Sequence, residues 1–256
     1  MKKTNAKSTA IFISAAGNGV RMKELTKNRP KPLIEINKKP IIDYLINSLL
    51  LKQEVNNIYV IYGYLKNKWE EYISSYKSKN IIFKYDSQPI NLINSFFKVA
   101  KFIKEEIIVV ISGDMVFDFE IFINALSYHK VSNNDVSVAL NKSSQNNYKC
   151  WDYVVSNETI VDIRHDSKST NIERYFFIIN KKVLEEFTVN FSKNMGDTVE
   201  EFRNYSEYNF GWSCLIKKLI DIDKYEIKAV YFDVPVVNVN EPEDLKKAEL
   251  ILNKKI

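Results

Sequence analysis

The chain has 256 residues, of which 45% are hydrophobic, enough to form one packed core. Its net charge of +5 comes partly from short basic stretches at both ends and is too small to indicate a nucleic-acid-binding protein. Cys150 and Cys214 form neither a metal-ligand spacing nor a disulfide framework, and no apolar run is long enough for a signal sequence or a membrane span. We therefore expect one cytoplasmic domain over residues 1–256, with residues 1–8 as a flexible tail.

The first half of the chain alternates predicted strands with predicted helices. We expect strands over residues 10–16, 56–65, 80–85 and 105–115, and helices over residues 40–50, 67–77 and 91–103. These strands are apolar on both faces, which is typical of a sheet covered by helices on both sides. The pattern predicts an α/β fold with an open, mostly parallel twisted sheet of the Rossmann-like kind.

The second half has a different rhythm, with short strands expected over residues 135–141, 150–156, 159–165 and 175–180. Two helical segments follow, and then a final strand over residues 228–240. A last helix over residues 241–255 has a proline at its start and acidic residues in its first turn, as helix N-termini favour. We expect these extra elements to form the wall of a pocket.

A glycine loop follows the first predicted strand, where open α/β sheets commonly bind phosphates. Gly17 and Gly19 permit positive φ angles and a close approach of the backbone to anionic oxygens. The dinucleotide fingerprint requires a small residue where Met22 stands, and the GK[ST] of a P-loop is absent. Arg21 and Lys31, the latter held between two prolines, add two cations that suit a triphosphate. An ordinary turn with solvated charges is the alternative, which the spaced cations make less favourable.

An acidic residue ends the most apolar predicted strand. Asp114 follows Gly113 at the carboxyl end of this strand, and it therefore faces the same crevice as the glycine loop. Mg²⁺ prefers one or two carboxylates together with phosphate oxygens, so Asp114 is a candidate anchor for a nucleotide-bound metal ion. The alternative is a helix-capping aspartate, a role that Asp118 fits better.

Three segments taken together resemble the nucleotidyltransferase superfamily of GT-A-like fold, which makes activated sugars and phosphocholine-type headgroups. They are "AAGNGVRM…RPKPL", "SGDMVFD" and "VNVNEPEDLKKAEL". The resemblance implies that Arg21 and Lys31 contact phosphates, that Asp114 binds Mg²⁺, and that Asn240 is the second metal ligand. A neutral amide at that position weakens the metal site. The nucleotide would lie on the loop formed by Ala15, Ala16, Gly17, Asn18 and Gly19.

The reaction implied by the resemblance is attack by a phosphate oxygen of an acceptor on the α-phosphorus of a nucleoside triphosphate, with release of pyrophosphate. Such a reaction needs positioning and neutralisation of charge rather than a side-chain nucleophile. Lys168 is a candidate contact for the acceptor's phosphate, with a solvated loop lysine as the alternative. The expected partners are thus a nucleoside triphosphate and a phosphorylated small molecule, with neither nucleic acid nor membrane.

The acceptor and the base depend on the segment from Ser87 to Phe97, which aligns with the stretch that contacts base and acceptor in the family. Asn91 and Asn94 are closer to the version found in phosphocholine cytidylyltransferases than to that of sugar-phosphate enzymes. Trp151 and Trp212 are candidate walls of an aromatic cage for a quaternary ammonium group. CTP and a phosphocholine-like acceptor are therefore favoured, although packing of these aromatic residues and a sugar 1-phosphate acceptor stay open.

Two other classes of protein share this pattern. A GT-A glycosyltransferase has the same fold and an acid at a strand end, but does not need the "RPKP" segment. A catalytically silent binding relative would also keep the fold, and Asn240 is the feature that points to it.

Overall fold

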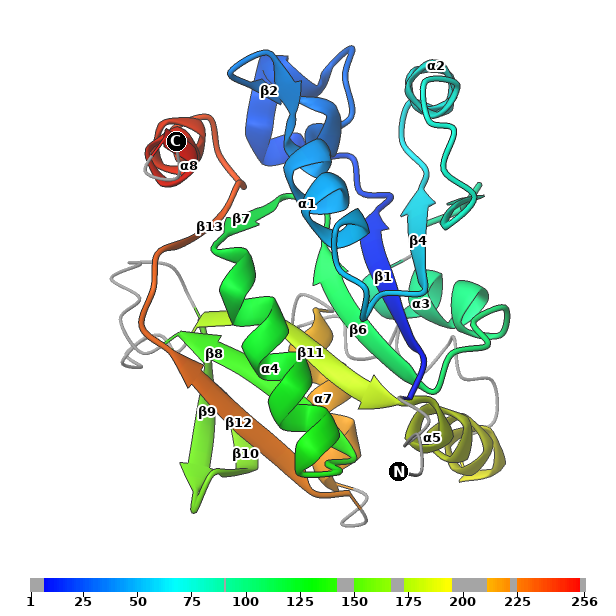
Figure 1. The fold of residues 1–256 in the computed structure, drawn as a ribbon, viewed down its shortest axis with the longest axis vertical. Coiled ribbons are helices and arrows are strands. Elements are labelled where there is room, and N and C mark those ends of the chain that lie inside the picture. The colour runs from blue at the N-terminus through cyan, green and yellow to red at the C-terminus, as the bar shows by residue number, and fades with distance from the viewer. Residues whose placement is uncertain are drawn as a thin grey trace.

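The computed structural model describes residues 7–89, 91–141, 150–166, 173–194, 211–221 and 225–253. A nine-stranded open sheet forms the centre of the molecule (Figure 1). Its strands lie side by side in the order β5 (Ile81–Tyr85), β4 (Asn57–Tyr62), β1 (Thr9–Ala15), β6 (Ile107–Ser112), β11 (Glu173–Asn180), β8 (Val136–Asn141), β12 (Ile227–Phe232), β10 (Thr159–Asp166) and β9 (Cys150–Ser156).

The N-terminal part of the sheet is parallel. β1 pairs in parallel with β4 and β6, and β4 pairs in parallel with β5, so these four strands end at one edge of the sheet. β11 runs antiparallel to β6 and β8, and β9, β10 and β12 continue the sheet with one further parallel pairing, β12 with β8. The Rossmann-like α/β class predicted from the sequence is confirmed.

Helices cover both faces of the sheet because the strand residues are apolar on both sides. Along β1, Phe12 points into one hydrophobic cluster, whereas Ile11 and Ile13 point into the other, and all three are fully buried. α3 (Leu92–Ala100), α5 (Lys181–Asn194) and α7 (Trp212–Asp221) cover the first face. α1 (Ile41–Leu50), α2 (Lys66–Ile73) and α4 (Phe119–Val131) cover the second, and α1 and α4 lie in front of the sheet in Figure 1.

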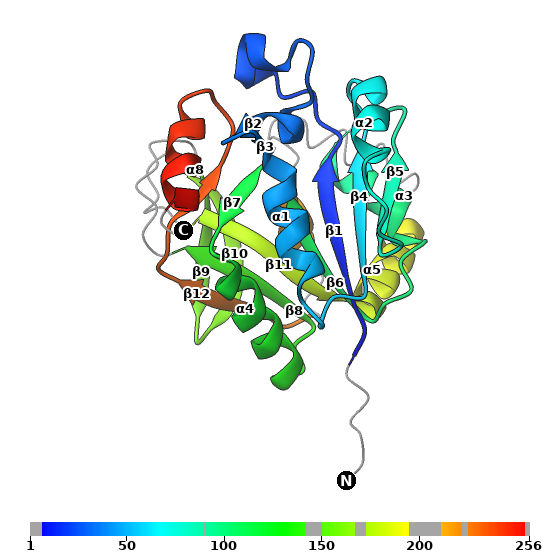
Figure 2. The ribbon, with the colours of Figure 1, turned by 45° about the horizontal axis from the view of Figure 1, so that its top comes forward.

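Small elements close over the carboxyl edge of the parallel strands. Two 3-10 helices, η1 (Val20–Thr26) and η2 (Lys31–Leu33), follow β1, and a short hairpin joins β2 (Glu35–Ile36) to β3 (Lys39–Pro40). β7 (Met115–Phe117) pairs antiparallel with β13 (Val236–Asn238), and α8 (Asp244–Asn253) follows. Figure 2, with this edge turned forward, shows η1 above β1 and α8 beside β2. Segments far apart in the sequence therefore meet at one edge of the sheet.

The final predicted strand over residues 228–240 is wrong in one respect, because the structure divides it in two. β12 ends at Phe232 in the main sheet, and β13 begins at Val236 and pairs with β7 instead. Pro235 lies between them, and a proline cannot donate to a ladder of hydrogen bonds. The break lets the chain leave the main sheet and reach the carboxyl edge.

Two residues of the expected N-terminal tail, Lys7 and Ser8, are bonded to the rest of the structure. Lys7 Nζ donates to Asn133 Oδ1 at 2.6 Å, and the backbone of Ser8 bonds Glu106 and Ile107. Residues 1–6 lie outside the described residues. Across the described ranges, no helix has the length and apolar content needed to cross a membrane.

Candidate nucleotide site

The glycine loop leaves β1 at the carboxyl edge, as the sequence predicted. Gly19 has φ +63° and ψ 35°, a left-handed conformation that favours glycine. A Cβ atom added to Gly19 would lie 2.9 Å from the Cβ atom of Lys31, whereas one added to Gly17 would meet nothing within 4 Å. Ala15 and Ala16 are buried and anchor the loop, and Asn18 is exposed. The loop is therefore packed against Lys31 on one side and open at Gly17.

Lys31 is held by its prolines. Pro30 has φ −56° and ψ 141°, and Lys31 begins η2, whose Pro32 and Leu33 are buried. The rings of Pro30 and Pro32 on either side of Lys31 limit the backbone here, and the burial of Pro32 and Leu33 holds the segment in place. Its side chain is only 15% exposed and forms an ion pair with Asp114. The lysine that the sequence singled out thus points toward the predicted acid.

Asp114 lies next to the base of the glycine loop. The N–H of Gly113 donates to Ser14 O at 2.9 Å, and a Cβ atom on Gly113 would lie 3.2 Å from the Cβ atom of Ala15. Glycine therefore allows the segment after β6 to approach the end of β1 closely. The side chain of Asp114 is 12% exposed and faces Lys31. The predicted acid and the predicted loop are brought together.

The C-terminal segment adds two asparagines to this site. β13 pairs with β7, and the N–H of Val239 donates to Asp114 O at 2.9 Å. Because side chains alternate along an extended chain, Val239 is fully buried while Asn238 and Asn240 lie on the other side. Asn238, with its amide nitrogen turned to the acid, donates to both carboxylate oxygens of Asp114 at 3.0 and 3.2 Å.

Asn240 connects both predicted cations. Its Oδ1 accepts hydrogen bonds from Arg21 at 2.7 Å and from Lys31 Nζ at 3.1 Å. Asp244 holds the backbone at this point, since its carboxylate accepts from the N–H groups of Asn240 at 3.1 Å and Glu241 at 3.0 Å. Burial of Asp244 raises its pKa, but hydrogen bonds from Lys247 and these two N–H groups lower the pKa by more, so the carboxyl stays ionised.

The oxygens of Asp114 and Asn240 fit a magnesium ion that arrives with phosphates. Lys31 Nζ contacts both oxygens, so a cation already lies between them. One carboxylate and one amide oxygen are a sparse set, but Mg²⁺ needs only one or two protein ligands when phosphate oxygens and water complete its shell. Within the described ranges, no group of three or more His, Cys, Asp or Glu side chains could hold a metal ion without such help.

The other side of the glycine loop carries Asn91 and Asn94. Asn91 is the N-cap of α3, and its side chain accepts a hydrogen bond from the N–H of Asn94 at 2.8 Å. The side-chain oxygen of Asn94 is buried and has no hydrogen-bond partner among the described residues. The side chain of Asn91 therefore caps α3, and the side-chain oxygen of Asn94 remains able to accept a hydrogen bond.

Of the three residues expected to bind the acceptor, Trp212 is the one whose side chain the structure describes. Trp212 is fully buried against Phe12, Phe96 and Phe177, with ring centroids 5.6 to 6.0 Å apart. It is a core residue, so the expectation that Trp212 walls an open cage does not fit its position. Trp151 lies in β9, opposite His165 of β10. The side chain of Trp151 and all of Lys168 lie outside the described residues.

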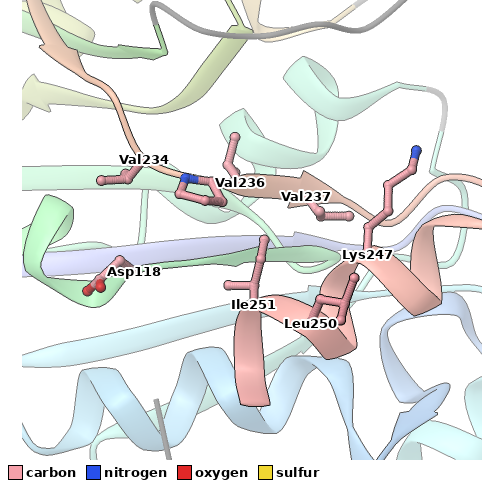
Figure 3. Close-up of a pocket in the computed structure, with 8 residues that line it drawn as sticks. Asp118, Val234, Val236, Val237, Lys247, Leu250 and Ile251 are labelled. Carbon is pink, nitrogen blue, oxygen red and sulfur yellow. The ribbon is translucent and has the colours of Figure 1, made fainter. Parts of the chain in front are cut away.

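A separate apolar pocket of about 390 Å³ lies between β13 and α8 (Figure 3). Val234, Val236, Val237, Leu250 and Ile251 line it, with Asp118 and Lys247 at its ends. None of the residues predicted to bind nucleotide, metal or acceptor contributes to its lining. A pocket lined mainly by valine, leucine and isoleucine offers few donors to phosphates, so it does not compete with the charged site as the place for a triphosphate.

Comparison with known families agrees with the charged site. Residues 11–176, well over half of the chain, match the family described as nucleotidyl transferase. The chain belongs to this family. The matched range contains the glycine loop, Arg21, Lys31 and Asp114, whereas Asn238 and Asn240 lie beyond it.

Individual members of the family resemble parts or all of the chain. The 2-aminoethylphosphonate cytidylyltransferase of Lancefieldella rimae is 32% identical over 120 residues, 47% of this chain and 48% of that protein. The chain spans less than half the length of the curated relatives that it matches.

Solved structures show the same fold. The inositol-1-phosphate CTP transferase from T. maritima superimposes with a TM-score of 0.73 at 18% identity, covering 98% of this chain and 97% of that one. The CTP:phosphocholine cytidylyltransferase from Streptococcus pneumoniae has a TM-score of 0.69 at 21% identity, covering 96% of this chain and 99% of that one.

Sequence reasoning missed two residues of the site. Asn238 touches the carboxylate of Asp114, and Asp244 fixes the backbone of Asn240. The alternation Asn-Val-Asn at residues 238–240 is a signal that two amides share one face of an extended segment. Their place beside Asp114 depends on the pairing of β13 with β7, which is not visible in local sequence.

Proposed function

We propose that the chain is a magnesium-dependent nucleotidyltransferase that joins the NMP unit of CTP to a phosphorylated small molecule and releases pyrophosphate. The observation that carries the proposal is the convergence of Arg21, Lys31, Asp114 and Asn240 beside an open glycine loop. Four separate segments of the chain supply two cations, one carboxylate and a set of backbone N–H groups at the edge where open α/β sheets bind ligands.

The balance of charge at the site supports a polyphosphate. Lys31 pairs with the carboxylate of Asp114, whereas Arg21 contacts the neutral amide of Asn240, so the cluster of these four residues carries one excess positive charge. Their contact with Asn240 is to a neutral oxygen, which a phosphate oxygen would replace with a stronger, charge-assisted bond. The resting contacts therefore hold both cations close to the place where a triphosphate would bind.

The reaction needs no side-chain nucleophile. A phosphate oxygen of the acceptor attacks the α-phosphorus, forming one P–O bond while the bond to the leaving pyrophosphate breaks, and the leaving group carries away the electron pair. Lys31 and Arg21 would neutralise negative charge on the phosphates, and the glycine loop would fix their position. Asp114 and Asn240 would hold Mg²⁺, which supplies further charge neutralisation when it is bound with the nucleotide.

For the acceptor, we favour a small phospho-alcohol that bears an amine, such as phosphocholine. Asn91 and Asn94 support a cytidylyltransferase, as do the relatives named for CTP, 2-aminoethylphosphonate and phosphocholine. Trp151 stays our candidate for the wall that contacts a trimethylammonium group, and Lys168 for the contact to the acceptor's phosphate.

A cyclic polyol or sugar 1-phosphate is the second candidate acceptor. The observation that favours it is the likeness over nearly the whole chain to a transferase named for inositol 1-phosphate. Both acceptors present a phosphate monoester to the same α-phosphorus, so the chemistry of the charged site is the same for both. Only the residues that surround the organic part of the acceptor distinguish them.

The deciding experiment is a pyrophosphate-release assay with purified protein and Mg²⁺. The four common nucleoside triphosphates are tested against phosphocholine, phosphoethanolamine, inositol 1-phosphate and several sugar 1-phosphates. We expect the highest kcat/KM with CTP and phosphocholine. Turnover of sugar 1-phosphates alone would replace the acceptor and keep the reaction.

Two further results would replace the reaction itself. Sugar transfer from an NDP-sugar without pyrophosphate release would identify a GT-A glycosyltransferase. Binding of a nucleoside triphosphate without turnover of any acceptor would support a catalytically silent relative.

A further inference from the structure

A second buried acid lies at the same edge of the sheet, on the other side of the glycine loop. Asp86 follows β5 directly and is 4% exposed. Its N–H donates to Tyr62 O at 2.8 Å, which joins it to the end of β4. None of the roles derived from the sequence uses this residue.

The carboxylate of Asp86 ties together both ends of the segment that carries Asn91 and Asn94. One oxygen accepts from Ser95 Oγ at 2.7 Å, and the other accepts from Lys98 Nζ at 2.7 Å and from the N–H of Gln88 at 3.1 Å. Lys98 Nζ also donates to Gln88 O at 3.0 Å. Asp86 is thus bonded to Gln88 just after β5 and to Ser95 and Lys98 of α3.

The balance of these contacts keeps the acid charged. Burial raises the pKa of Asp86, but the hydrogen bonds from Lys98, Ser95 and Gln88 lower it by more, so the pKa lies below its usual value. A buried carboxylate that is fully bonded in this way is costly to disturb. The ammonium group of Lys98 donates to both Asp86 and Gln88, so its positive charge stabilises the loop.

The segment also lies directly against the glycine loop. A Cβ atom on Gly63 would lie 3.0 Å from Asp86 O and 3.1 Å from Ala16 O, so the two loops meet across this glycine. The N–H of Tyr64 donates to Ala16 O at 3.3 Å and joins them further. A shift of the loop after β5 would therefore change the wall next to the glycine loop.

The strand order gives this wall its place relative to Asp114. Asp114 follows β6 and Asp86 follows β5, with β1 and β4 between these strands. Three strand spacings separate them by about 14 Å, a distance that an extended nucleoside triphosphate can span. With the phosphates between the glycine loop and Asp114, the nucleoside has the β4 and β5 side available.

From these contacts we infer that Asp86, through Lys98 and Ser95, positions the loop that binds the nucleoside part of the triphosphate, and that Asp86 is a positioning residue for base selection. The inference rests on the proposed nucleotidyltransferase function and adds a division of the site. The family resemblance already implies that the segment after β5 contacts the base, and the inference adds that Asp86 holds this segment in place. The glycine loop and Asp114 would then serve every nucleoside triphosphate alike, and the segment held by Asp86 would distinguish their bases.

Calorimetric titration with two probes tests the division. MgCTP reports on the whole site, and magnesium tripolyphosphate reports on the phosphate side alone. We expect Asp86→Asn to raise the Kd for MgCTP about tenfold and to change the Kd for tripolyphosphate less than about twofold, because a charged hydrogen-bond network that orders one loop is lost. Discrimination between CTP and the other three nucleoside triphosphates should fall in the same variant.

Matched variants make the test specific. Lys98→Met and Ser95→Ala remove one donor each and should raise the Kd for MgCTP in the same direction, whereas Lys98→Arg should restore most of the affinity. Lys101→Met is the control, because Lys101 is an exposed lysine just beyond α3 that lies over the ring of Phe102. Thermal melts accompany each titration.

The outcomes separate the inference from the function on which it rests. Equal loss of both probes in Asp86→Asn, or unchanged MgCTP affinity, overturns the positioning role and leaves the proposed function intact. A wild-type protein that binds neither probe overturns both. Where Asp86→Asn does not fold, Lys98→Met and Ser95→Ala decide, and unchanged MgCTP affinity in both overturns the inference.

Discussion

Asp114 and Asp86 follow parallel strands at the same edge of the sheet, and each is buried and paired with a lysine. Their partners differ in origin. Asp86 receives its bonds from within its own segment, residues 86–98, whereas Asp114 meets Lys31 and Asn238, which come from remote parts of the chain. Hydrogen bonds within one short segment, like those of Asp86, can persist whether or not a ligand is bound, and they hold the loop in one conformation. Partners from several segments bring charged and amide groups together at the edge where open α/β sheets bind ligands.

A glycine on each side of the loop allows the segment that carries the acid to approach the end of β1. Gly113 lets the segment of Asp114 approach Ala15, and Gly63 lets the segment of Asp86 approach Ala16. In both positions an added Cβ atom would lie 3.0 to 3.3 Å from atoms of the facing segment. The glycine loop, which follows β1, therefore lies between two buried acids, Asp114 after β6 on one side and Asp86 after β5 on the other.

The largest expected effect comes from removing the first acid. Asp114→Ala should reduce pyrophosphate release to background at saturating Mg²⁺ while the protein stays folded, because the anchor for the metal ion is lost. Asp118→Ala is the matched control, since Asp118 is the N-cap of α4 and accepts from the N–H of Glu120. It should keep turnover and lose about 1 kcal/mol of stability. Retained turnover in Asp114→Ala would remove the distinction between the two acids.

The next largest effect is expected for the core residue Trp212, which packs against the helix that Asp86 holds. Trp212 contacts Phe96 of α3, so Trp212→Ala should cost about 3 to 5 kcal/mol of unfolding free energy and lower all kinetic parameters together.

Trp151→Ala, by contrast, should raise KM for a trimethylammonium acceptor about tenfold, equivalent to roughly 1.4 kcal/mol, with little effect on CTP. Denaturant titration beside the kinetics separates the two. If Trp212→Ala raised only the KM for the acceptor and left stability unchanged, Trp212 would be an acceptor-binding residue after all.

Lys31 tests the phosphate side directly. Lys31→Ala should lower kcat/KM by on the order of 10²-fold or more, because a donor aimed at charge that develops in the transition state is lost. Lys27→Ala is the control, because Lys27 is exposed and pairs only with Glu24 in the described part of the chain. A change below about threefold in Lys31→Ala would show that Lys31 does not stabilise charge on the reacting phosphates.

Local sequence predicted the strands, helices and charged residues well, because hydrophobic periodicity and loop composition are local properties. The helix expected over residues 40–50 is α1, Ile41–Leu50, and the loop with Lys31 and the turn with Asp114 are where the pattern put them. Pairing between remote segments is not a local property. The contact of Asn238 with Asp114 depends on such pairing and is not predicted, and for Trp212 the sequence leaves core packing and an aromatic cage open as alternatives.

Asn91 shows a second kind of limit. An asparagine before a helix satisfies both a capping role and a binding role in the sequence, and only the structure shows its side chain bonded to the N–H of Asn94. The acid Asp86 was passed over for the opposite reason. Its partners Ser95 and Lys98 stand nine and twelve residues away, with no motif to mark them, and the turn into α3 brings them together.

The two loop glycines give a smaller, structural contrast. Gly19→Ala should lose about 1 to 2 kcal/mol of stability, because alanine at φ +63° is strained and its Cβ atom would meet Lys31. Gly17→Ala has open space around the added atom, so its melting temperature should stay close to that of the wild type. Equal destabilisation by both substitutions would show that the loop is not held against Lys31.

The pH dependence of stability sharpens the description of the second acid. The pKa of Asp86 is lowered in the folded protein, so its contribution to stability is complete above the unfolded-state pKa of about 3.9 and is lost as the pH falls through the lower folded-state value. The difference in unfolding free energy between the wild type and Asp86→Asn should therefore shrink as the pH is lowered below about 4. Urea titrations of both proteins at a series of pH values measure this difference.

The difference, rather than the wild-type curve alone, is the useful quantity because another group titrates in the same range. Burial lowers the pKa of His129 to about 4, so its contribution to stability is complete above the unfolded-state pKa near 6.5 and falls as the pH is lowered toward 4. His129 is hydrogen-bonded to Ser137 of β8 and Asn180 of β11. Both residues lie at the edge of the sheet opposite to the carboxyl edge of the parallel strands. His129 acts equally in both proteins and cancels in the difference. A gap that stays constant from pH 7 to below pH 4 would show that the Asp86 carboxylate adds no charge-dependent stability to its loop.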